Sequence, residues 1–318
     1  MKPPYEITGK TLGLISLIAE QIGEIKTARI IKPPTELRKK NRIKTIQSSL
    51  EIEGNTLSVE QITDLINNKR VLAPKKEILE AKNAIKVYSK LDTFNTFKLA
   101  SLCSAHEILM KGLLEAPGQI RKTSVGIIKG ENIAHIAPPG DRVYPLMKDL
   151  FDYLETDDDL LLIKSCVFHY ELEFIHPFID GNGRVGRLWQ TMILKEYSPV
   201  FEFLPIESLV KERQQDYYSV LRKSDSEGKS TSFIEFMLEI IHMALEDLLN
   251  TQNLTVKDID RIEWFKIIIG NKEFSRKDYL RHNKEISSAT ASRDLKTAVE
   301  MGNLSKSGDK RLTRYRFK

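Results

Sequence analysis

Apolar residues recur every three or four positions along most of the chain, which is the spacing that places them on one face of an α-helix. Prolines and glycines divide the pattern into segments of helical length, as at 33–34, 117–118 and 138–140. Two runs show the period clearly: Leu12, Ile15, Ile18, Ile22 and Ile25, and Ile234, Met237, Leu238, Ile241 and Leu245. The pattern predicts a mainly α protein.

One segment has a different pattern. Between Lys122 and Ala137, β-branched residues flank the turn signal Lys-Gly-Glu-Asn at 129–132, which predicts a β-hairpin among the helices. Two strands alone are only marginally stable in water. We therefore expect this hairpin to pack against another element or to pair through its edge with a partner.

Charge divides the chain unevenly. The 318 residues contain 49 Lys and Arg against 44 Asp and Glu, and from Thr255 onward the count is 16 against 9. The excess of positive charge therefore lies in the tail, for which we expect an acidic partner. A polar stretch at 250–255, which follows a long amphipathic pattern, predicts a domain boundary before residue 255.

Composition excludes several classes of protein. With 41% apolar residues the chain is not intrinsically disordered, and 16 Gly and 12 Pro are too few for a fibrous protein. Cys103 and Cys166 stand singly in apolar runs, which predicts buried free thiols in a reducing compartment and therefore a cytoplasmic protein. No apolar run approaches the roughly 18 residues of a membrane span, so no membrane partner is expected.

The tail has a pattern of its own. Helices are predicted at 259–268, 275–282 and 288–301, followed by a hairpin that turns at 307–309. Three helices and a hairpin in this order predict a winged helix-turn-helix domain over residues 255–318.

The residues of this predicted domain suit nucleic acid. Small polar residues at the start of its last helix, together with Arg293 and Lys296, suit a DNA groove. Such modules also bind proteins, so the partner stays open between DNA and protein. The hairpin residues expected to meet phosphates are Lys310, Arg311, Arg314 and Arg316.

The most informative segment for chemistry is 174–187, Phe-Ile-His-Pro-Phe-Ile-Asp-Gly-Asn-Gly-Arg-Val-Gly-Arg. Pro177, Gly181 and Gly183 interrupt the helical pattern, which resumes from Arg184. Glycines directly before a helix leave backbone N–H groups that can converge on an anion. We therefore expect a phosphate site at the start of this helix.

Four side chains surround the expected anion site. His176 can accept a proton near neutral pH, and Asp180 offers the hard oxygen that Mg²⁺ prefers. Arg184 and Arg187 share a face of the first helical turn and can both reach a polyphosphate. A base, a metal ligand, an amide nest and two guanidiniums are the groups needed to transfer a phosphorus-containing group to a hydroxyl.

These residues form the pattern His-Pro-Phe-x-Asp-Gly-Asn-Gly-Arg-x-x-Arg, which resembles the signature of Fic-domain proteins at every specified position. The resemblance covers roughly residues 74–246, and the hairpin is similar to the family's substrate-binding flap. It implies a Fic-type helical domain with a β-hairpin flap at 74–254, preceded by a helical region at 1–73. It also implies transfer of AMP from ATP, with Mg²⁺, to a Ser, Thr or Tyr hydroxyl of a protein substrate bound at the flap.

The resemblance also implies a role for each residue of the motif. His176 is the general base, Asp180 holds Mg²⁺, and the two arginines grip the β- and γ-phosphates. The flap covers the nucleotide, while Tyr217, Tyr218 and Asp225 line the adenine pocket. The implied ATP-binding residues are Ile133, Ala134, His135, Ile136, Asp180, Gly181, Asn182, Gly183, Arg184, Val185, Gly186, Arg187, Tyr217, Tyr218 and Asp225.

A second motif lies upstream, at the end of a helix predicted over about 35–54. The spacing Ser49-x-x-x-Glu53-Gly54 resembles the inhibitory motif of Fic proteins, placed N-terminal to the catalytic core as in the second class of the family. The resemblance implies that Glu53 forms a bidentate ion pair with Arg187, which removes that guanidinium from the γ-phosphate of ATP.

Two other interpretations stay open at this point. In one, the chain is a DNA-binding regulator whose Fic domain is vestigial or senses nucleotide, although all of its chemical positions are intact. In the other, it is a Fic enzyme that removes AMP, with Glu53 positioning water, or that moves another phosphate-containing group. The target protein, and a homodimer that modulates the inhibition, are also left open.

Overall fold

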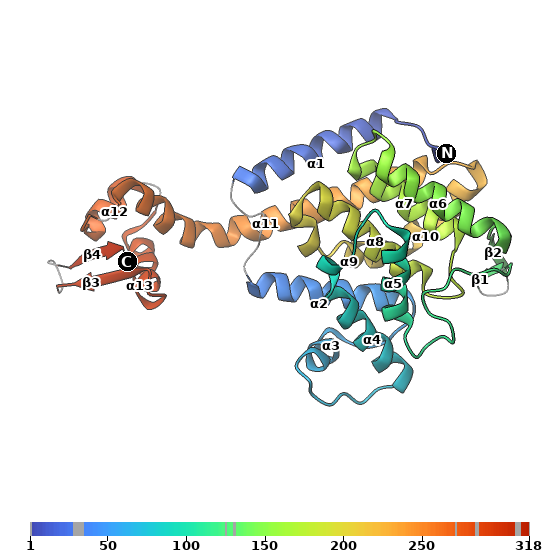
Figure 1. Cartoon of the computed structure of the whole chain (residues 1–318). Coiled ribbons are helices and arrows are strands. Elements are labelled where there is room, and N and C mark those ends of the chain that lie inside the picture. The colour runs from blue at the N-terminus through green and yellow to red at the C-terminus, as the bar shows by residue number, and fades with distance from the viewer. Residues whose placement is uncertain are drawn as a thin grey trace. The chain divides into compact units, whose positions relative to one another are not determined.

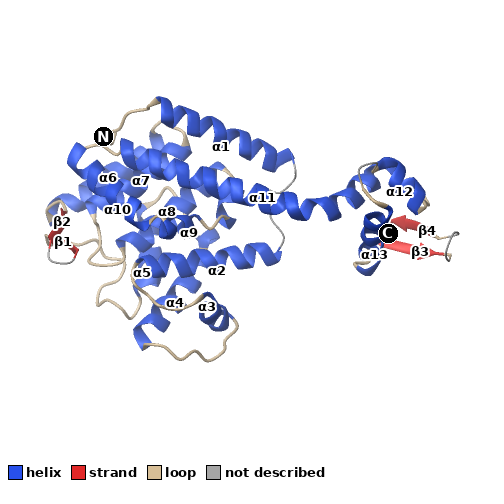
Figure 2. Cartoon of the chain, turned by 180° about the vertical axis from the view of Figure 1, so that it is seen from behind, coloured by secondary structure: helices blue, strands red, loops and turns tan. Residues whose placement is uncertain are grey.

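The computed structural model describes residues 2–27, 35–124, 126–129, 132–270, 272–283, 286–308 and 313–317, with the side chains of all of these except 36, 126–129, 132–136, 251–260, 263, 264 and 267. Its regular structure is mostly helical, as the apolar pattern predicts, and Figure 2 shows two small hairpins as the strands. No helix in these ranges is both long and apolar enough to cross a membrane.

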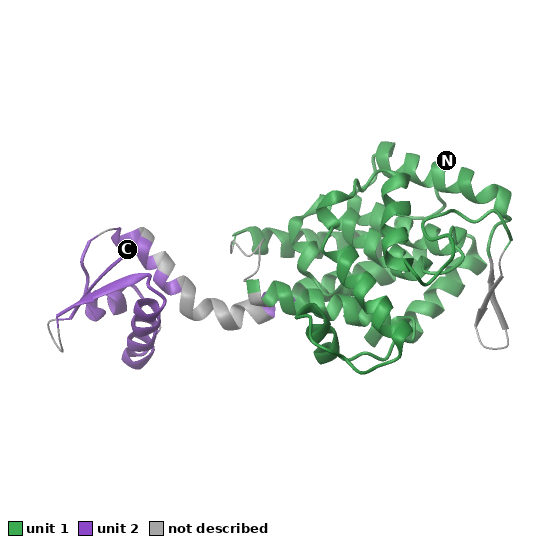
Figure 3. Ribbon diagram, turned by 60° about the horizontal axis from the view of Figure 1, so that its bottom comes forward, with its two compact units in different colours: residues 1–246 green, residues 247–318 purple. Residues whose placement is uncertain are grey.

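The chain divides into two units, residues 1–246 and 247–318 (Figure 3). The division falls inside one helix, α11 (Thr231–Ile269), which continues through the polar stretch at 250–255. This stretch contains no Gly or Pro, so nothing in its backbone forces the helix to end. The predicted boundary at 254/255 lies further along the same helix, and no separation of units falls near residue 73.

The first unit is a helical bundle in which α7 and α8 lie in the middle (Figure 1). Every residue of α7 from 162 to 170 is buried, so this helix is surrounded on all sides. Its helices are α1 (Gly9–Thr27), α2 (Thr35–Ile52), α3 (Val59–Ile66), α4 (Lys75–Tyr88), α5 (Leu99–Met110), α6 (Gly140–Thr156), α7 (Leu161–Ile175), α8 (Asn182–Tyr197), α9 (Ile206–Glu212), α10 (Gln214–Glu227) and the start of α11, with 3₁₀ turns η1 (Leu91–Thr93) and η2 (Pro199–Phe203). The two thiols are free, with Cys166 buried and Cys103 half-buried.

Helix α2 is held firmly in this bundle. Its apolar side chains Ile43, Ile46 and Leu50 are buried, and the helix packs against α9. Asn41 Nδ2 donates to the carbonyl of Phe203 at 2.9 Å from a buried position. The helix ends as predicted at Gly54, whose φ of 89° lets the N–H of Asn55 donate back to the carbonyl of Leu50 at 3.1 Å.

The predicted flap is a two-stranded antiparallel hairpin, β1 (Gly126–Lys129) and β2 (Asn132–Ile136). A bulge shifts the register between Ile127 and Ile128. Strand β2 lies beside α10, which gives the hairpin the support that two strands need. The turn residues Gly130 and Glu131 lie outside the described residues.

The second unit contains the elements expected of the tail, α12 (Arg276–His282), α13 (Ser288–Glu300), β3 (Leu304–Ser307) and β4 (Arg314–Phe317). The first of the three predicted helices, 259–268, is the last part of α11. The strands pair antiparallel, and residues 309–312 between them, which include Lys310 and Arg311, lie outside the described residues. The core of this unit consists of Ile262, Phe265, Phe274, Tyr279, Ala291, Leu295, Ala298, Leu304 and Phe317.

Candidate active site

The motif residues form a tight loop between α7 and α8. Helix α7 ends at His176, which adopts the left-handed conformation with φ 51°. Gly181 is also left-handed, with φ 87°, and directly precedes α8. Asn182 closes the loop, because its amide accepts from the N–H and donates to the carbonyl of Phe178, both at 2.9 Å.

Two residues for which the sequence predicted no role in the site, His106 and Arg121, hold this loop in place. His106 stacks on Phe178 with ring centroids 3.7 Å apart, and its Nε2 lies 2.8 Å from the carbonyl oxygen of Asp180. Burial lowers the pKa of His106 to about 4, so the ring is neutral and donates from Nε2. The Arg121 guanidinium donates to the carbonyls of His176 at 2.7 Å and Ile175 at 3.0 Å.

Replacing Arg121 with alanine is expected to lower the free energy of unfolding by about 2–4 kcal/mol, because it leaves several buried carbonyls without a donor. Besides the carbonyls of Ile175 and His176, the guanidinium donates hydrogen bonds to the carbonyls of Thr123 and Pro138. Urea unfolding measures the loss, with the exposed Arg142→Ala as a control expected to change little. Equal stability of the two variants would show that Arg121 does not hold the loop.

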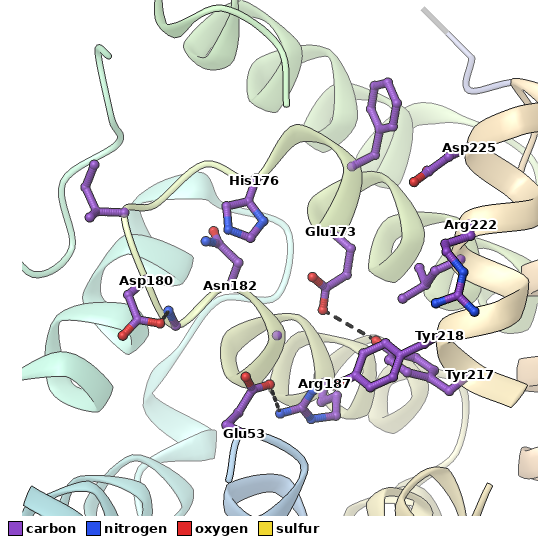
Figure 4. A pocket seen from close by; sticks show the side chains of 15 residues that line it. Glu53, Glu173, His176, Asp180, Asn182, Arg187, Tyr217, Tyr218, Arg222 and Asp225 are labelled. Atoms are coloured by element: carbon purple, nitrogen blue, oxygen red, sulfur yellow. Dashed lines mark hydrogen bonds and ion pairs between the residues drawn. The ribbon is translucent and has the colours of Figure 1, made fainter. Parts of the chain in front are cut away.

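A pocket of about 250 Å³ opens beside the motif loop (Figure 4). Of the residues predicted for the site, the pocket brings together His176, Asp180, Gly181, Asn182, Gly183, Arg187, Tyr217, Tyr218, Asp225 and Glu53, the last of which was predicted to be inhibitory. It is also lined by residues that sequence reasoning missed, namely Glu173, Phe174, Ile179, Leu221 and Arg222. Elements far apart in the sequence therefore contribute to one cavity.

Other predicted residues lie elsewhere. Val185 is fully buried and Gly186 faces His169 and Leu172, so both belong to the packing of α8 on α7. Arg184 is almost buried; its Nη1 lies 3.5 Å from Glu80 and its Nη2 3.4 Å from Asp180. The side chains of the flap residues 133–136 lie outside the described part of the chain.

An ion pair at the pocket joins Glu53 to Arg187. Nη2 of the arginine donates to Glu53 Oε1 at 2.8 Å and to the backbone carbonyl of Ser49 at 2.9 Å, while Nε donates to Ser49 Oγ at 3.2 Å. Burial by itself lowers the pKa of Arg187, but the charge and hydrogen bond of Glu53, together with the smaller effects of Tyr217 and Glu173, outweigh burial and raise the pKa. The expected bidentate pair is thus replaced by a guanidinium shared between Ser49 and Glu53.

Glu53 also lies against the start of α8. A Cβ atom placed on Gly183 would be 2.5 Å from Glu53 Oε1, so the carboxylate lies directly against the backbone of the first turn. A negative group is favourable at a helix N-terminus. Glu53 therefore lies where a phosphate of a nucleotide would be stabilised.

One wall of the pocket is backed by a network of hydrogen-bonded polar side chains. The Tyr217 hydroxyl is 3.1 Å from His169 Nε2 and 3.4 Å from Glu173 Oε1, and His169 Nδ1 is 2.7 Å from Gln190 Oε1. Burial, with the nearby charge of Arg187, lowers the pKa of His169 to about 3. His169 is thus a neutral structural residue. Within the described ranges, no three His, Cys, Asp or Glu side chains form a metal cluster.

Glu207 of α9 is a buried carboxyl group that is close enough to Arg187 for the two charges to interact. One of its oxygens accepts from Tyr88 at 3.3 Å and Thr191 at 3.4 Å, and the other has no hydrogen-bond partner within the described part of the chain. Burial raises the pKa of Glu207 from 4.5 to about 7. The carboxyl group therefore stays protonated up to a higher pH in the folded protein than in the unfolded chain.

The stability of the protein is expected to depend on pH through Glu207. Because its pKa is raised on folding, its contribution is complete below about pH 4.5 and is lost as the pH rises through 7, at a cost of at most about 3 kcal/mol. Glutamine at this position cannot ionise. The stability of Glu207→Gln minus that of the wild type should therefore be more favourable at pH 8 than at pH 4.5. Thermal unfolding at both pH values measures this, with exposed Glu115→Gln as the control. A difference that does not vary with pH would contradict it.

Comparison with known proteins agrees with the geometry. A model of the Fic/DOC family matches residues 96–194. A crystal structure of a Fic family protein from Desulfovibrio desulfuricans G20 is 40% identical in sequence, covers 100% of this chain and 98% of that chain, and has a TM-score of 0.77. The chain belongs to the Fic family. The resemblance inferred from the motif is thereby confirmed.

Curated relatives within the family carry the name protein adenylyltransferase. The fic-1 protein of Caenorhabditis briggsae is 29% identical over 209 residues, which are 60% of this chain and 38% of that protein. The Fic protein of Culex quinquefasciatus is 29% identical over 218 residues, which are 64% of this chain and 41% of that protein. The matched part is thus about two fifths of these longer Fic proteins. Fic-1 of C. elegans, 19% identical with a TM-score of 0.61 over 77% of this chain and 76% of that chain, shares the fold.

Proposed function

We propose that this Fic protein is a protein adenylyltransferase, which transfers AMP from ATP to a hydroxyl of a target protein. The observation that carries the proposal is the convergence of His176, Asp180, the amides at the start of α8 and Arg187 on one pocket. The name of the curated relatives supports the same activity.

In the proposed reaction, His176 takes the proton of the target hydroxyl as its oxygen bonds to the α-phosphorus. The bond from that phosphorus to the bridging oxygen of pyrophosphate breaks, and pyrophosphate leaves. The backbone amides before α8 hold the phosphates, and Arg187 binds the terminal one once Glu53 has moved. Positioning and charge stabilisation thus supply most of the catalysis.

Asp180 is the residue that would hold Mg²⁺. Its side chain is 56% exposed at the pocket, and Oδ1 accepts from the N–H of Gly181 at 2.6 Å. One accessible carboxylate together with substrate phosphates is a usual environment for Mg²⁺, so the residues fit this ion. When bound, Mg²⁺ would neutralise charge on the phosphates. Arg184, which lies 3.4 Å from Asp180, would reach a phosphate by leaving Glu80.

The proposal includes autoinhibition by Glu53. Its carboxylate occupies Arg187 and the space beside Gly183, so a γ-phosphate and Glu53 compete for the same guanidinium. Because α2 is fixed by buried contacts, the step that requires least rearrangement is movement of Glu53 at the end of the helix. We place the target protein at the flap, where an extended segment can add to the edge of β2.

The reaction class is tested by the mass that Mg²⁺-ATP adds to protein. The Glu53→Gly variant, incubated with Mg²⁺-ATP and candidate hydroxyl-bearing proteins, should yield a protein whose mass has risen by one AMP unit. An added phosphate group, or no added mass on any protein including the enzyme itself, would overturn the proposed transfer.

A further inference from the structure

The second unit carries a concentration of exposed positive charge. Over the described residues from 272 to the end, the acidic side chains that are not buried are Glu273, Asp278 and Glu300. The exposed cations in the same range are Lys272, Arg276, Lys277, Arg281, Arg293, Lys296, Lys306, Arg314 and Arg316. Such an excess attracts a polyanion.

The remaining acidic residue in this range does not reduce the surface charge. Asp294 is 4% exposed and accepts from Arg261 Nε at 2.9 Å and Nη2 at 3.1 Å, a bidentate pair. The Tyr279 hydroxyl donates to the same carboxylate at 3.1 Å. This buried contact attaches α13 to α11 and α12, so that α13 presents a fixed outer face.

The outer face of α13 suits close approach to a partner. Its buried side holds Ala291, Leu295 and Ala298, while Arg293 and Lys296 are exposed on the other side. The residues at the exposed start of the helix are small, Ser288, Ala289, Thr290 and Ser292. They allow the helix backbone to come near a partner without steric conflict.

Two neighbouring elements add charge next to this face. Arg276 of α12 donates to Ser292 Oγ at 2.8 Å and so brings a guanidinium onto α13. In the hairpin, Leu304 pairs with Phe317 on the buried side, and strand alternation places Arg314 and Arg316 on the opposite side.

We propose that the C-terminal unit binds duplex DNA, with α13 in the major groove and the hairpin arginines on the phosphates. The major groove is wide enough for one α-helix, and small residues at the helix start let its backbone approach the base edges. Arg276, Arg293 and Lys296 then lie beside the two phosphate chains that border the groove. This binding is independent of AMP transfer, so either proposal can fail alone.

The test uses the full-length protein and a labelled 20-base-pair duplex of arbitrary sequence. Fluorescence anisotropy should give a dissociation constant on the order of 10⁻⁶ M at low salt, and affinity should fall steeply as salt rises. Arg293→Ala combined with Lys296→Ala should weaken binding roughly tenfold or more and reduce the salt slope by about 2. Both side chains are exposed, so the fold should be retained.

A matched control removes two exposed lysines from a helix of the first unit. Lys82→Ala combined with Lys86→Ala takes the same charge from α4 and should leave DNA binding unchanged. Three results would overturn the proposal: no binding by the wild type at low salt, equal loss in both double variants, or equally tight binding of polyglutamate. The last would indicate an acidic protein surface as the partner.

Discussion

Glu53→Gly is expected to raise the rate of AMP transfer by roughly 10- to 100-fold. In the proposed reaction Glu53 supplies no group and withholds one, because its carboxylate accepts a hydrogen bond from Arg187 at 2.8 Å. A charge-assisted hydrogen bond of this kind contributes about 1.5–3 kcal/mol, which is the range of the expected change in rate. The glycine itself costs little, since residue 53 follows the last residue of α2.

The measurement is the initial rate of label transfer from ATP labelled at the α-phosphorus. Glu51→Gly is the matched control, because Glu51 lies on the same helix end but contacts Lys211, at 3.6 Å, instead of Arg187. It should leave the rate near that of the wild type. Glu53→Gln keeps the shape of the side chain without its charge, and its rate should lie between those of the wild type and Glu53→Gly. A rate unchanged by Glu53→Gly would exclude the inhibitory role.

Nucleotide affinity provides a second measure of the same contact. If Glu53 competes with the terminal phosphate for Arg187, Glu53→Gly should tighten binding of ATP much more than binding of AMP. Isothermal titration of both nucleotides compares them under one condition. An equal gain in affinity for ATP and AMP would show that Glu53 obstructs the pocket as a whole and does not compete specifically for Arg187.

The second large effect is expected at His176, whose removal in the Glu53→Gly background should lower AMP transfer by about 10²- to 10⁴-fold. The imidazole lines the pocket from the loop between α7 and α8 and is the proposed acceptor of the hydroxyl proton. Because residue 176 has a positive φ, His176→Asn suits the backbone better than alanine and separates loss of the base from loss of the loop.

ATP binding and folding are the controls for this variant. Its affinity for ATP should stay within a few-fold of the parent, since Arg187 and the amides at the start of α8 are unchanged. His242→Ala, which removes a histidine that contacts Gln21 away from the pocket, should keep full activity. Retained AMP transfer in His176→Asn would exclude His176 as the base.

The local features of the site could be predicted from the sequence because they depend on neighbouring residues. Pro177 and Gly181 break the helix, and Gly54 ends α2. Ser49 and Glu53 are four residues apart, a spacing that places both side chains on one side of the helix. The contact of Glu53 with Arg187 was predicted by resemblance of motifs. The share that Ser49 takes of the guanidinium was not predicted.

Features that depend on distant partners could not be predicted. His106 and Arg121 support the motif through backbone carbonyls, which carry no signal in the sequence. Arg184 was expected at the phosphates, yet Glu80 of α4 and Asp180 hold it beside the pocket. The polar stretch at 250–255, where a domain boundary was predicted, contains no Gly or Pro and is helical, and the two units divide earlier in the same helix, at 246/247.

The measurement that tests the proposed function most directly compares three proteins with ATP labelled at the α- or the γ-phosphorus. These are the wild type, Glu53→Gly, and Glu53→Gly combined with His176→Asn. Protein should acquire α-label weakly with the first, strongly with the second and hardly at all with the third, and it should acquire γ-label with none. Transfer of γ-label, or equal α-label with all three, would contradict AMP transfer restrained by Glu53 and carried out by His176.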